Sequence, residues 1–215
     1  MKTWLSPPTR EFSQGEFSAV VGLAFGLAIL GSLSAASSWT NQPIVFNDTE
    51  LAGTVGFELI VGTVIFLLLR HRGWTWSHFE VRATTGSTIV GVLIAGIVLA
   101  LWLLLEALLG KVPSEVDVTM PWIAITSIIN PAFEEMLVLG YVVQAMRKRF
   151  GLATGINVSI AIRVLYHLYQ GPMAVLPFAV MGAIVAVSYV RLGRLWPAIV
   201  AHAILDFVAL AGWFE

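Results

Sequence analysis

The sequence predicts an all-α fold: a polytopic integral membrane bundle of about seven transmembrane helices. Of the 215 residues, 58% are hydrophobic and only 12% are charged, and the mean hydropathy is +0.85. Soluble domains carry roughly 25% charged residues and few apolar runs of spanning length. The sequence contains no cysteine, which excludes disulfides, a thiol nucleophile and thiolate metal ligands.

Seven apolar segments are long enough to cross a hydrocarbon core, which takes about 20 residues. They cover residues 17–37, 51–69, 85–110, 121–146, 152–169, 173–190 and 195–213. The segment before them is polar, contains prolines and lacks the pattern of a cleaved signal peptide. We therefore expect a cytoplasmic amino-terminal segment, 1–16, and a single membrane-embedded domain over residues 17–215.

Basic residues are distributed unevenly between the loops. Ten of the twelve Lys and Arg residues precede the first predicted span or follow the second, fourth and sixth. The loops on the other side contain Lys111 and four acids, Asp48, Glu50, Glu115 and Asp117. Since basic loops stay on the cytoplasmic side, the amino terminus is predicted to be cytoplasmic and the carboxyl terminus to lie across the membrane.

Two adjacent carboxylates, Glu134 and Glu135, lie inside the fourth predicted span. A carboxylate at that depth is costly and indicates a functional site. Asn130 and Pro131 precede them, and the proline is expected to kink the helix where it faces protein or a cavity. Adjacent helical residues point about 100° apart, so the two glutamates cannot have the same role.

Two later spans carry polar pairs at a spacing of four residues, which places each pair on one helix face. Arg163 and His167 form the first pair, and His202 and Asp206 form the second. A glutamate and a histidine that meet in a dry cavity can deprotonate a water molecule. A second histidine with a hydrogen-bonding neighbour can stabilise the oxyanion that water attack creates.

Three stretches, "EEMLVLG", "RVLYH" and "HAILD", occur in this order in three predicted spans. They resemble the motifs EExxxRG, FxxxH and HxxxN or HxxxD of the CPBP family, the CAAX-protease and bacteriocin-processing (Abi) intramembrane endopeptidases. The resemblance covers about 121–213, which would be the catalytic core. It implies a membrane protein of a bacterial-type plasma membrane that hydrolyses a peptide bond in a membrane-associated protein or peptide, with no nucleic-acid partner.

The resemblance also implies roles for individual residues. Glu134 would be the general base and would act with His167 on the attacking water. His202 and Asp206 would stabilise the oxyanion, and Glu135 would support the site. The resemblance implies a glutamic endopeptidase, a type formerly called a metalloprotease, with no cofactor. The two histidines and the acids are also suited to Zn²⁺, but the sequence has no HExxH motif and a metal is not favoured.

The sequence departs from the family pattern at two linked positions. Leu139 occupies the place of the motif arginine, and Arg163 occupies the place of the motif phenylalanine. Adjacent carboxylates in low dielectric repel each other and need a cation, and a buried arginine needs a carboxylate. We therefore predict that Arg163 reaches Glu135, with Glu134 or Asp206 as its less favoured partners.

Other readings of the same residues remain open. A proton-coupled transporter also uses buried acids and histidines, but its usual repeated halves are not found here. A non-catalytic membrane scaffold is the other alternative, and the missing motif arginine is its best support. Five further polar or aromatic residues are interpreted as packing or interfacial residues: Glu58, Glu106, Tyr166, Tyr169 and Trp196.

Overall fold

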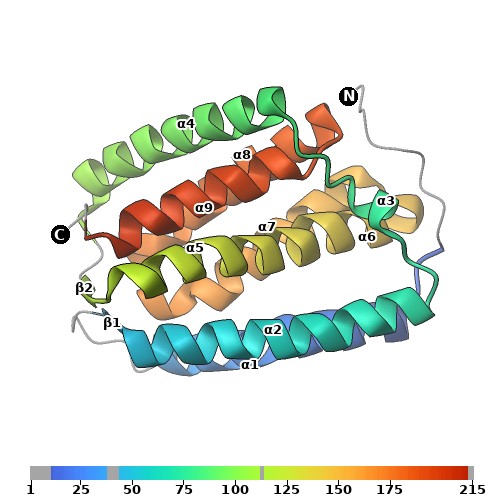
Figure 1. The fold of residues 1–215 in the computed structure, drawn as a ribbon, viewed down its shortest axis with the longest axis horizontal. Coiled ribbons are helices and arrows are strands. Elements are labelled where there is room, and N and C mark those ends of the chain that lie inside the picture. The colour runs from blue at the N-terminus through green and yellow to red at the C-terminus, as the bar shows by residue number, and fades with distance from the viewer. Residues whose placement is uncertain (1–10, 38–43, 112–113, 213–215) are drawn as a thin grey trace.

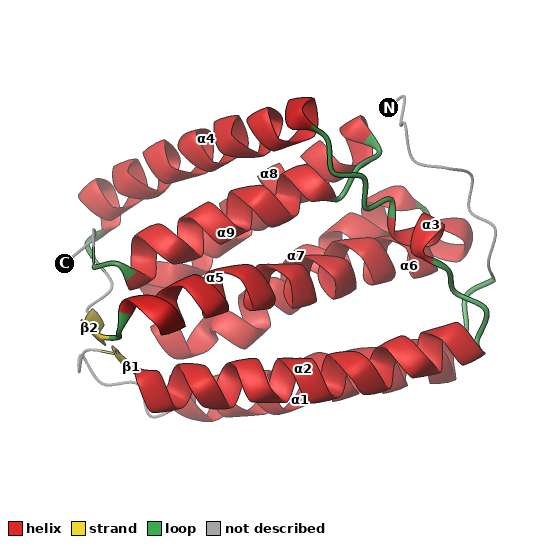
Figure 2. Cartoon of the chain, in the orientation of Figure 1, coloured by secondary structure: helices red, strands yellow, loops and turns green. Residues whose placement is uncertain are grey.

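A computed structural model of the chain describes residues 11–37, 44–111 and 114–212, and it confirms the all-α prediction (Figures 1 and 2). The long helices are α1 (Gln14–Ser37), α2 (Asp48–His71), α4 (Thr85–Leu109), α5 (Met120–Glu135), α7 (Leu152–His167), α8 (Pro172–Leu192) and α9 (Trp196–Leu210). Shorter elements are α3 (Trp76–Phe79), the π-helix η1 (Met136–Val143), α6 (Gln144–Phe150), the 3-10 turn η2 (Leu168–Gln170) and the strands β1 (Ile44–Asn47) and β2 (Ser114–Asp117).

Five helices in the described residues are long and apolar enough to cross a membrane. They are α1, α2, α4, the continuous segment Met120–Phe150 and α8. The apolar helix α9 is shorter, with 15 residues, and α7 has 16. Each predicted span thus contains a helix, although the last one extends to residue 213, outside the described residues. The helical membrane bundle is confirmed, and the number of seven crossings stays a prediction.

The loops and short elements that connect the long helices lie at the two ends of the bundle. Figure 1 shows α3, α6 and the start of α1 at one end and the two strands at the other. The backbone N–H of Leu195 donates to the Glu80 carbonyl at 3.0 Å, which joins the loop before α9 to the loop after α3. The described basic loops, which follow the second, fourth and sixth predicted spans, therefore gather at one end of the molecule, whereas Lys2 and Arg10 lie outside the described residues.

A short parallel pair of strands, which sequence reasoning missed, closes the other end. Strands β1 and β2 pair in parallel, with Ile44 opposite Ser114 and Asn47 opposite Asp117. Next to them, the Asp48 carboxylate accepts hydrogen bonds from the Thr119 backbone N–H at 2.7 Å and from its hydroxyl at 2.8 Å. These contacts hold the start of α2 against the start of α5, the two helices that later contribute Glu58 and Glu134.

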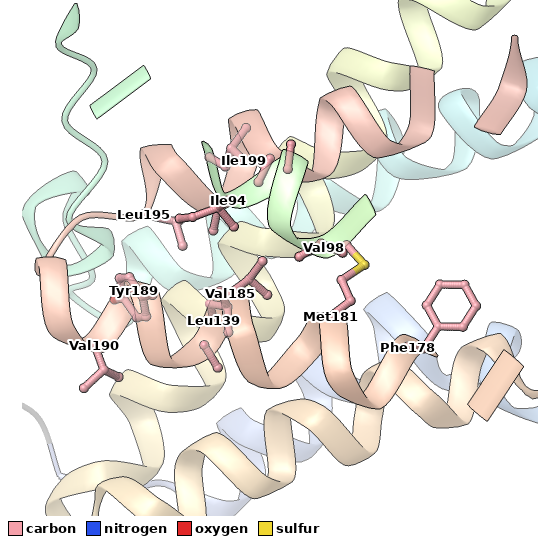
Figure 3. Close-up of a cluster of buried hydrophobic side chains, with 14 of the residues drawn as sticks. Ile94, Val98, Leu139, Phe178, Met181, Val185, Tyr189, Val190, Leu195 and Ile199 are labelled. Carbon is pink, nitrogen blue, oxygen red and sulfur yellow. The ribbon is translucent and has the colours of Figure 1, made fainter. Parts of the chain in front are cut away.

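Helix α9 is held in place by apolar packing against its neighbours. It contacts α4, α5 and α8, and Figure 3 shows the buried cluster among α4, η1, α8 and the start of α9. Val185, Tyr189 and Leu195 in that cluster have no exposed surface. Gly91 lets α4 approach closely, because a Cβ there would lie 2.7 Å from Val200 Cβ and 2.9 Å from the Pro197 carbonyl oxygen. This packing fixes the rotation of α9 about its axis.

Candidate active site

The two adjacent glutamates end α5, and the π-helix η1 begins at the next residue. Helix α5 continues through Pro131, and the kink expected at the proline stays a prediction. π-helical turns inside α-helices are rare and occur often at functional sites. A wider turn changes the direction in which the residues beyond it point, which no local sequence signal indicated.

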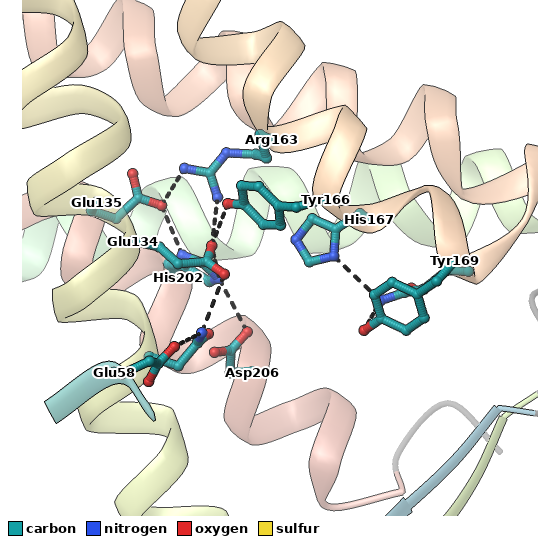
Figure 4. Close-up of polar contacts among 11 residues, drawn as sticks. Glu58, Glu134, Glu135, Arg163, Tyr166, His167, Tyr169, His202 and Asp206 are labelled. Carbon is teal, nitrogen blue, oxygen red and sulfur yellow. Dashed lines mark hydrogen bonds and ion pairs between the residues drawn. The ribbon is translucent and has the colours of Figure 1, made fainter. Parts of the chain in front are cut away.

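Glu135 is the carboxylate that Arg163 reaches, as predicted. Arg163 Nη2 donates to Glu135 Oε1 at 2.6 Å, and neither side chain has exposed surface (Figure 4). The same oxygen lies 2.7 Å from His202 Nδ1. Glu135 therefore links an arginine of α7 to a histidine of α9, and charge-assisted bonds of this kind are stronger than neutral ones.

Glu134 points to a different set of groups. Its Oε2 accepts a hydrogen bond from the Tyr166 hydroxyl at 2.5 Å and lies 3.6 Å from Arg163 Nη1. Its Oε1 accepts from Asn130 Nδ2 at 3.2 Å. A carboxylate oxygen has two lone pairs, so these contacts orient Glu134 and leave acceptor capacity for a ligand.

His202 connects the two carboxylates with Asp206. Its Nε2 lies 3.2 Å from Asp206 Oδ1, one turn along α9, and 4.0 Å from Glu134 Oε2. Each ring nitrogen thus faces a carboxylate oxygen, because Nδ1 faces Glu135. The ring cannot rotate without losing one of these contacts, so its Nε2–H direction is fixed.

The position of the His167 ring is fixed by stacking on the Phe178 ring. Its ring lies parallel to the Phe178 ring, with centroids 3.7 Å apart and planes 6° apart. Its Nδ1 lies 3.5 Å from Gln170 Nε2, and its Nε2 is buried without a hydrogen-bond partner in the described part of the chain. No direct hydrogen bond joins His167 to Glu134 among these residues. The unpartnered Nε2 is therefore the nitrogen that can serve a ligand.

A cavity of about 860 Å³ brings the predicted site residues together. Glu134, His167, His202 and Asp206 all line it, as the sequence predicted when it placed them in one site. Glu135 and Arg163 do not belong to its lining and lie behind it, in contact with lining residues. The structure thus separates the two adjacent glutamates: one faces the cavity, and the other is packed in its wall.

Three side chains of this site were interpreted from the sequence as packing or interfacial residues or were given no role. Tyr166 donates to Glu134, Asn130 donates to both Glu134 and Glu58, and Glu58 of α2 lines the cavity. Burial of Glu58 inside an apolar span was the signal available in the sequence. Of the two interpretations of Glu58, the structure agrees with helix packing and not with an interfacial position, because Glu58 is buried and its Oε1 accepts from Asn130 at 2.6 Å.

Glu106 and Tyr169 also line the cavity. The Trp102 indole N–H donates to Glu106 Oε1 at 2.9 Å. Trp196 lies elsewhere, where its indole N–H donates to the Thr88 hydroxyl at 2.9 Å. Among the residues that the structure describes, no three His, Asp or Glu side chains are grouped so that they could hold a metal ion.

The fold and the site together define a class of protein: a helical membrane bundle in which buried carboxylates and histidines line a cavity. Residues 116–208 match the family model described as "Type II CAAX prenyl endopeptidase Rce1-like". This match confirms the resemblance to the CAAX proteases that the three motifs carry. No curated protein and no solved structure gives a significant match. Residues 116–208 are thus similar to a family of CAAX proteases.

Proposed function

We propose that this protein is an intramembrane endopeptidase that hydrolyses a peptide bond of a membrane-associated or lipid-associated protein with a water molecule activated by Glu134 and His167. The observation that supports this most is the shared cavity. Glu134, His167 and His202 come from three helices and line one cavity, within the residues that match a protease family.

In the first step, Glu134 accepts a proton from a water molecule that attacks the carbonyl carbon of the scissile bond. Asn130 and Tyr166 hold the Glu134 carboxylate, which supports its role as a positioned base. His167 orients the same water through Nε2, the nitrogen that has no protein partner among the described residues. Positioning of both reactants lowers the entropic part of the barrier.

In the second step, the tetrahedral oxyanion is stabilised by His202. Glu135 orients the ring through Nδ1, and the oxyanion shares the Nε2–H with Asp206, whose Oδ1 lies 3.2 Å from Nε2. Preorganised donors of this kind are worth about 10²–10³ in rate. The carbon–nitrogen bond then breaks, and the proton held by Glu134 passes to the leaving amine. Glu135 and Arg163 keep His202 and Glu134 in position and do not touch the substrate.

The proposal includes the remaining expectations from the sequence. The catalytic core covers about 121–213 of a single membrane-embedded domain, and the amino terminus is cytoplasmic in a bacterial-type plasma membrane. The proposed chemistry uses no metal or other cofactor, so treatment with a chelator is expected to leave cleavage unchanged. Loss of cleavage that Zn²⁺ restores would assign the water activation to a metal.

Substitution Glu134→Gln tests the proposal, because it keeps the shape and removes the base. Membranes that contain wild-type protein are expected to accumulate new protein amino termini, detected by mass spectrometry, and the variant is expected to lose them by about 10²-fold or more. Glu115→Gln is a matched control, since Glu115 is exposed on β2 and does not line the cavity. Equal patterns in wild type and Glu134→Gln would favour a scaffold.

A further inference from the structure

The cavity carries an excess of acidic side chains. Among the described residues that line it there is no Lys or Arg, and its acids are Glu50, Glu58, Glu106, Glu134 and Asp206. The buried cation nearest to them, Arg163, lies behind the lining and is bonded to Glu135. The reaction proposed above uses Glu134 and Asp206, so the other three acids have no role in it.

Among these three acids, Glu58 has a buried oxygen that lacks a hydrogen-bond partner in the described part of the chain. Its side chain is 5% exposed, in the middle of an apolar helix outside the region that matches the protease family. Its Oε1 accepts from Asn130, but its Oε2 is buried with no hydrogen-bond partner in the described part of the chain. Burial of this oxygen without a hydrogen-bond partner is costly, and the Asn130 amide reaches only Oε1.

Glu58 also lies beside the reacting groups. The same Asn130 amide nitrogen contacts Glu58 Oε1 at 2.6 Å and Glu134 Oε1 at 3.2 Å, so one amide group joins the two carboxylates (Figure 4). An extended peptide advances about 3.3 Å per residue. A group bound by Glu58 therefore belongs to a residue within one or two positions of a bond that Glu134 attacks.

We propose that Glu58 forms a subsite for a cationic side chain of the substrate, a lysine or arginine next to the scissile bond. The inference rests on the proposed function and specifies its substrate class. An ammonium or guanidinium group supplies the donor that Glu58 Oε2 lacks and balances the acids of the cavity. The same acids oppose a substrate that brings a free terminal carboxylate to this place, because like charges repel in low dielectric. The preferred substrate is an internal peptide bond beside a basic residue.

Binding to the Glu134→Gln variant tests the subsite without any need for cleavage. The probes are amidated alanine–leucine peptides with one central lysine, norleucine or glutamate, added to the protein in phosphatidylcholine vesicles. The lysine peptide is expected to bind about tenfold tighter than the norleucine peptide or more, since a hydrogen bond to a charged group has this strength. The glutamate peptide is expected to bind weakest.

Adding Glu58→Gln to the Glu134→Gln variant should abolish the preference for the lysine peptide over the norleucine peptide. Glutamine keeps an oxygen for Asn130 and replaces the other carboxyl oxygen with a neutral NH2 group, which cannot accept from a cation, and near-identical thermal unfolding of the two proteins would verify that the fold is kept. Glu115→Gln in the same background serves as the matched control and should keep the preference. Equal affinity for the lysine and norleucine peptides, or a preference that survives Glu58→Gln, would overturn the subsite.

The same peptides given to the wild-type protein separate this inference from the proposed function. Cleavage of lysine and norleucine peptides at equal efficiency, with equal binding, would retain the protease and reject the subsite. Glu58-dependent binding of the lysine peptide without cleavage of any peptide would retain the subsite and count against the protease. A free-acid version of the lysine peptide, with the lysine two residues from its end, is expected to bind more weakly than its amide.

Discussion

Arg163 and Glu135 form a fully buried ion pair, with 2.6 Å between Nη2 and Oε1. The pair joins α7 to the end of α5, and the arginine stands at a different position from the one that the family motif uses. The cation needed beside two adjacent carboxylates is therefore supplied here from a neighbouring helix. Leu139 stands in place of the motif arginine, and Arg163 stands in place of the motif phenylalanine. These two departures therefore compensate for each other.

Removal of this arginine is expected to destabilise the protein severely. Arg163→Ala leaves Glu135 buried without its cation, which costs roughly 3–5 kcal/mol. The free energy of unfolding, measured in detergent with a denaturant, checks this value. Arg191→Ala, at an exposed position of α8, is the control and should change it by less than about 0.5 kcal/mol. A loss below 1 kcal/mol for Arg163→Ala would contradict a structural role for the pair.

A second-site change is expected to restore part of that loss. Leu139 has no exposed surface and lies one turn after Glu135, where the family motif carries its arginine. Leu139→Arg in the Arg163→Ala background should recover stability, because it returns a cation to the same carboxylates. The same substitution in the wild-type background should destabilise, since it adds an unpaired buried charge. A double variant no more stable than Arg163→Ala would reject the compensation.

The Tyr166 hydroxyl is expected to affect the reaction more than the fold. Tyr166→Phe removes the donor to Glu134 Oε2 and keeps the ring, which stacks on Phe25 with centroids 5.1 Å apart. We expect kcat to fall by about tenfold, in keeping with loss of one hydrogen bond to a charged group. Thermal unfolding should change little. An unchanged kcat would show that Asn130 and Arg163 are sufficient to hold Glu134.

Asp206 is expected to act on His202 as a hydrogen-bond acceptor. Asp206→Asn keeps a side-chain oxygen for His202 Nε2 and should retain most of the activity, whereas Asp206→Leu should lose it by about 10²-fold. The ratio of the two kcat values is the measurement. If both variants lose activity equally, the charge of Asp206 is what the site requires.

The approach of α4 to α9 is expected to be essential for the site. Gly91→Ala would place a methyl group against Val200 and the Pro197 carbonyl, so α9 must move, at a cost of about 1–3 kcal/mol. Gly96→Ala on the same helix meets no atom within 4 Å and should cause no loss of stability. Activity should follow the same order, because α9 carries His202 and Asp206. Equal unfolding temperatures for the two variants would contradict this packing argument.

Much of this site was predictable because spacing along a helix is a local property. Residues four apart share a face wherever the helix lies, so the pairs Arg163 with His167 and His202 with Asp206 followed from the sequence. The cost of a charge in an apolar span also predicted that these groups meet one another. The ion pair of Arg163 with Glu135 followed from charge balance together with the absence of the motif arginine at Leu139.

Other features depend on contacts that no short stretch contains. Glu58 and Asn130 are 72 residues apart in the chain, and the interfacial interpretation of Glu58 failed because its partner lies on another helix. The parallel pairing of β1 with β2 and the π-helix η1 were missed for the same reason. The two strands lie in segments that are far apart in the chain, and neither the strand pair nor the π-helix has a strong local pattern.

The sequence by itself determined that this is a helical membrane protein, where its helices lie and which charged groups they bury, because apolar length and the 3.6-residue period are encoded locally. Helix geometry alone left open which of the two adjacent glutamates faces the cavity, and the tertiary structure shows that it is Glu134, as the family resemblance implied. That choice depends on the rotation of α5 about its axis, and the rotation is set by packing against α2, α9 and η1. Glu134 consequently faces the cavity with Glu58 beside it, and Glu135 holds Arg163 and His202 in the wall.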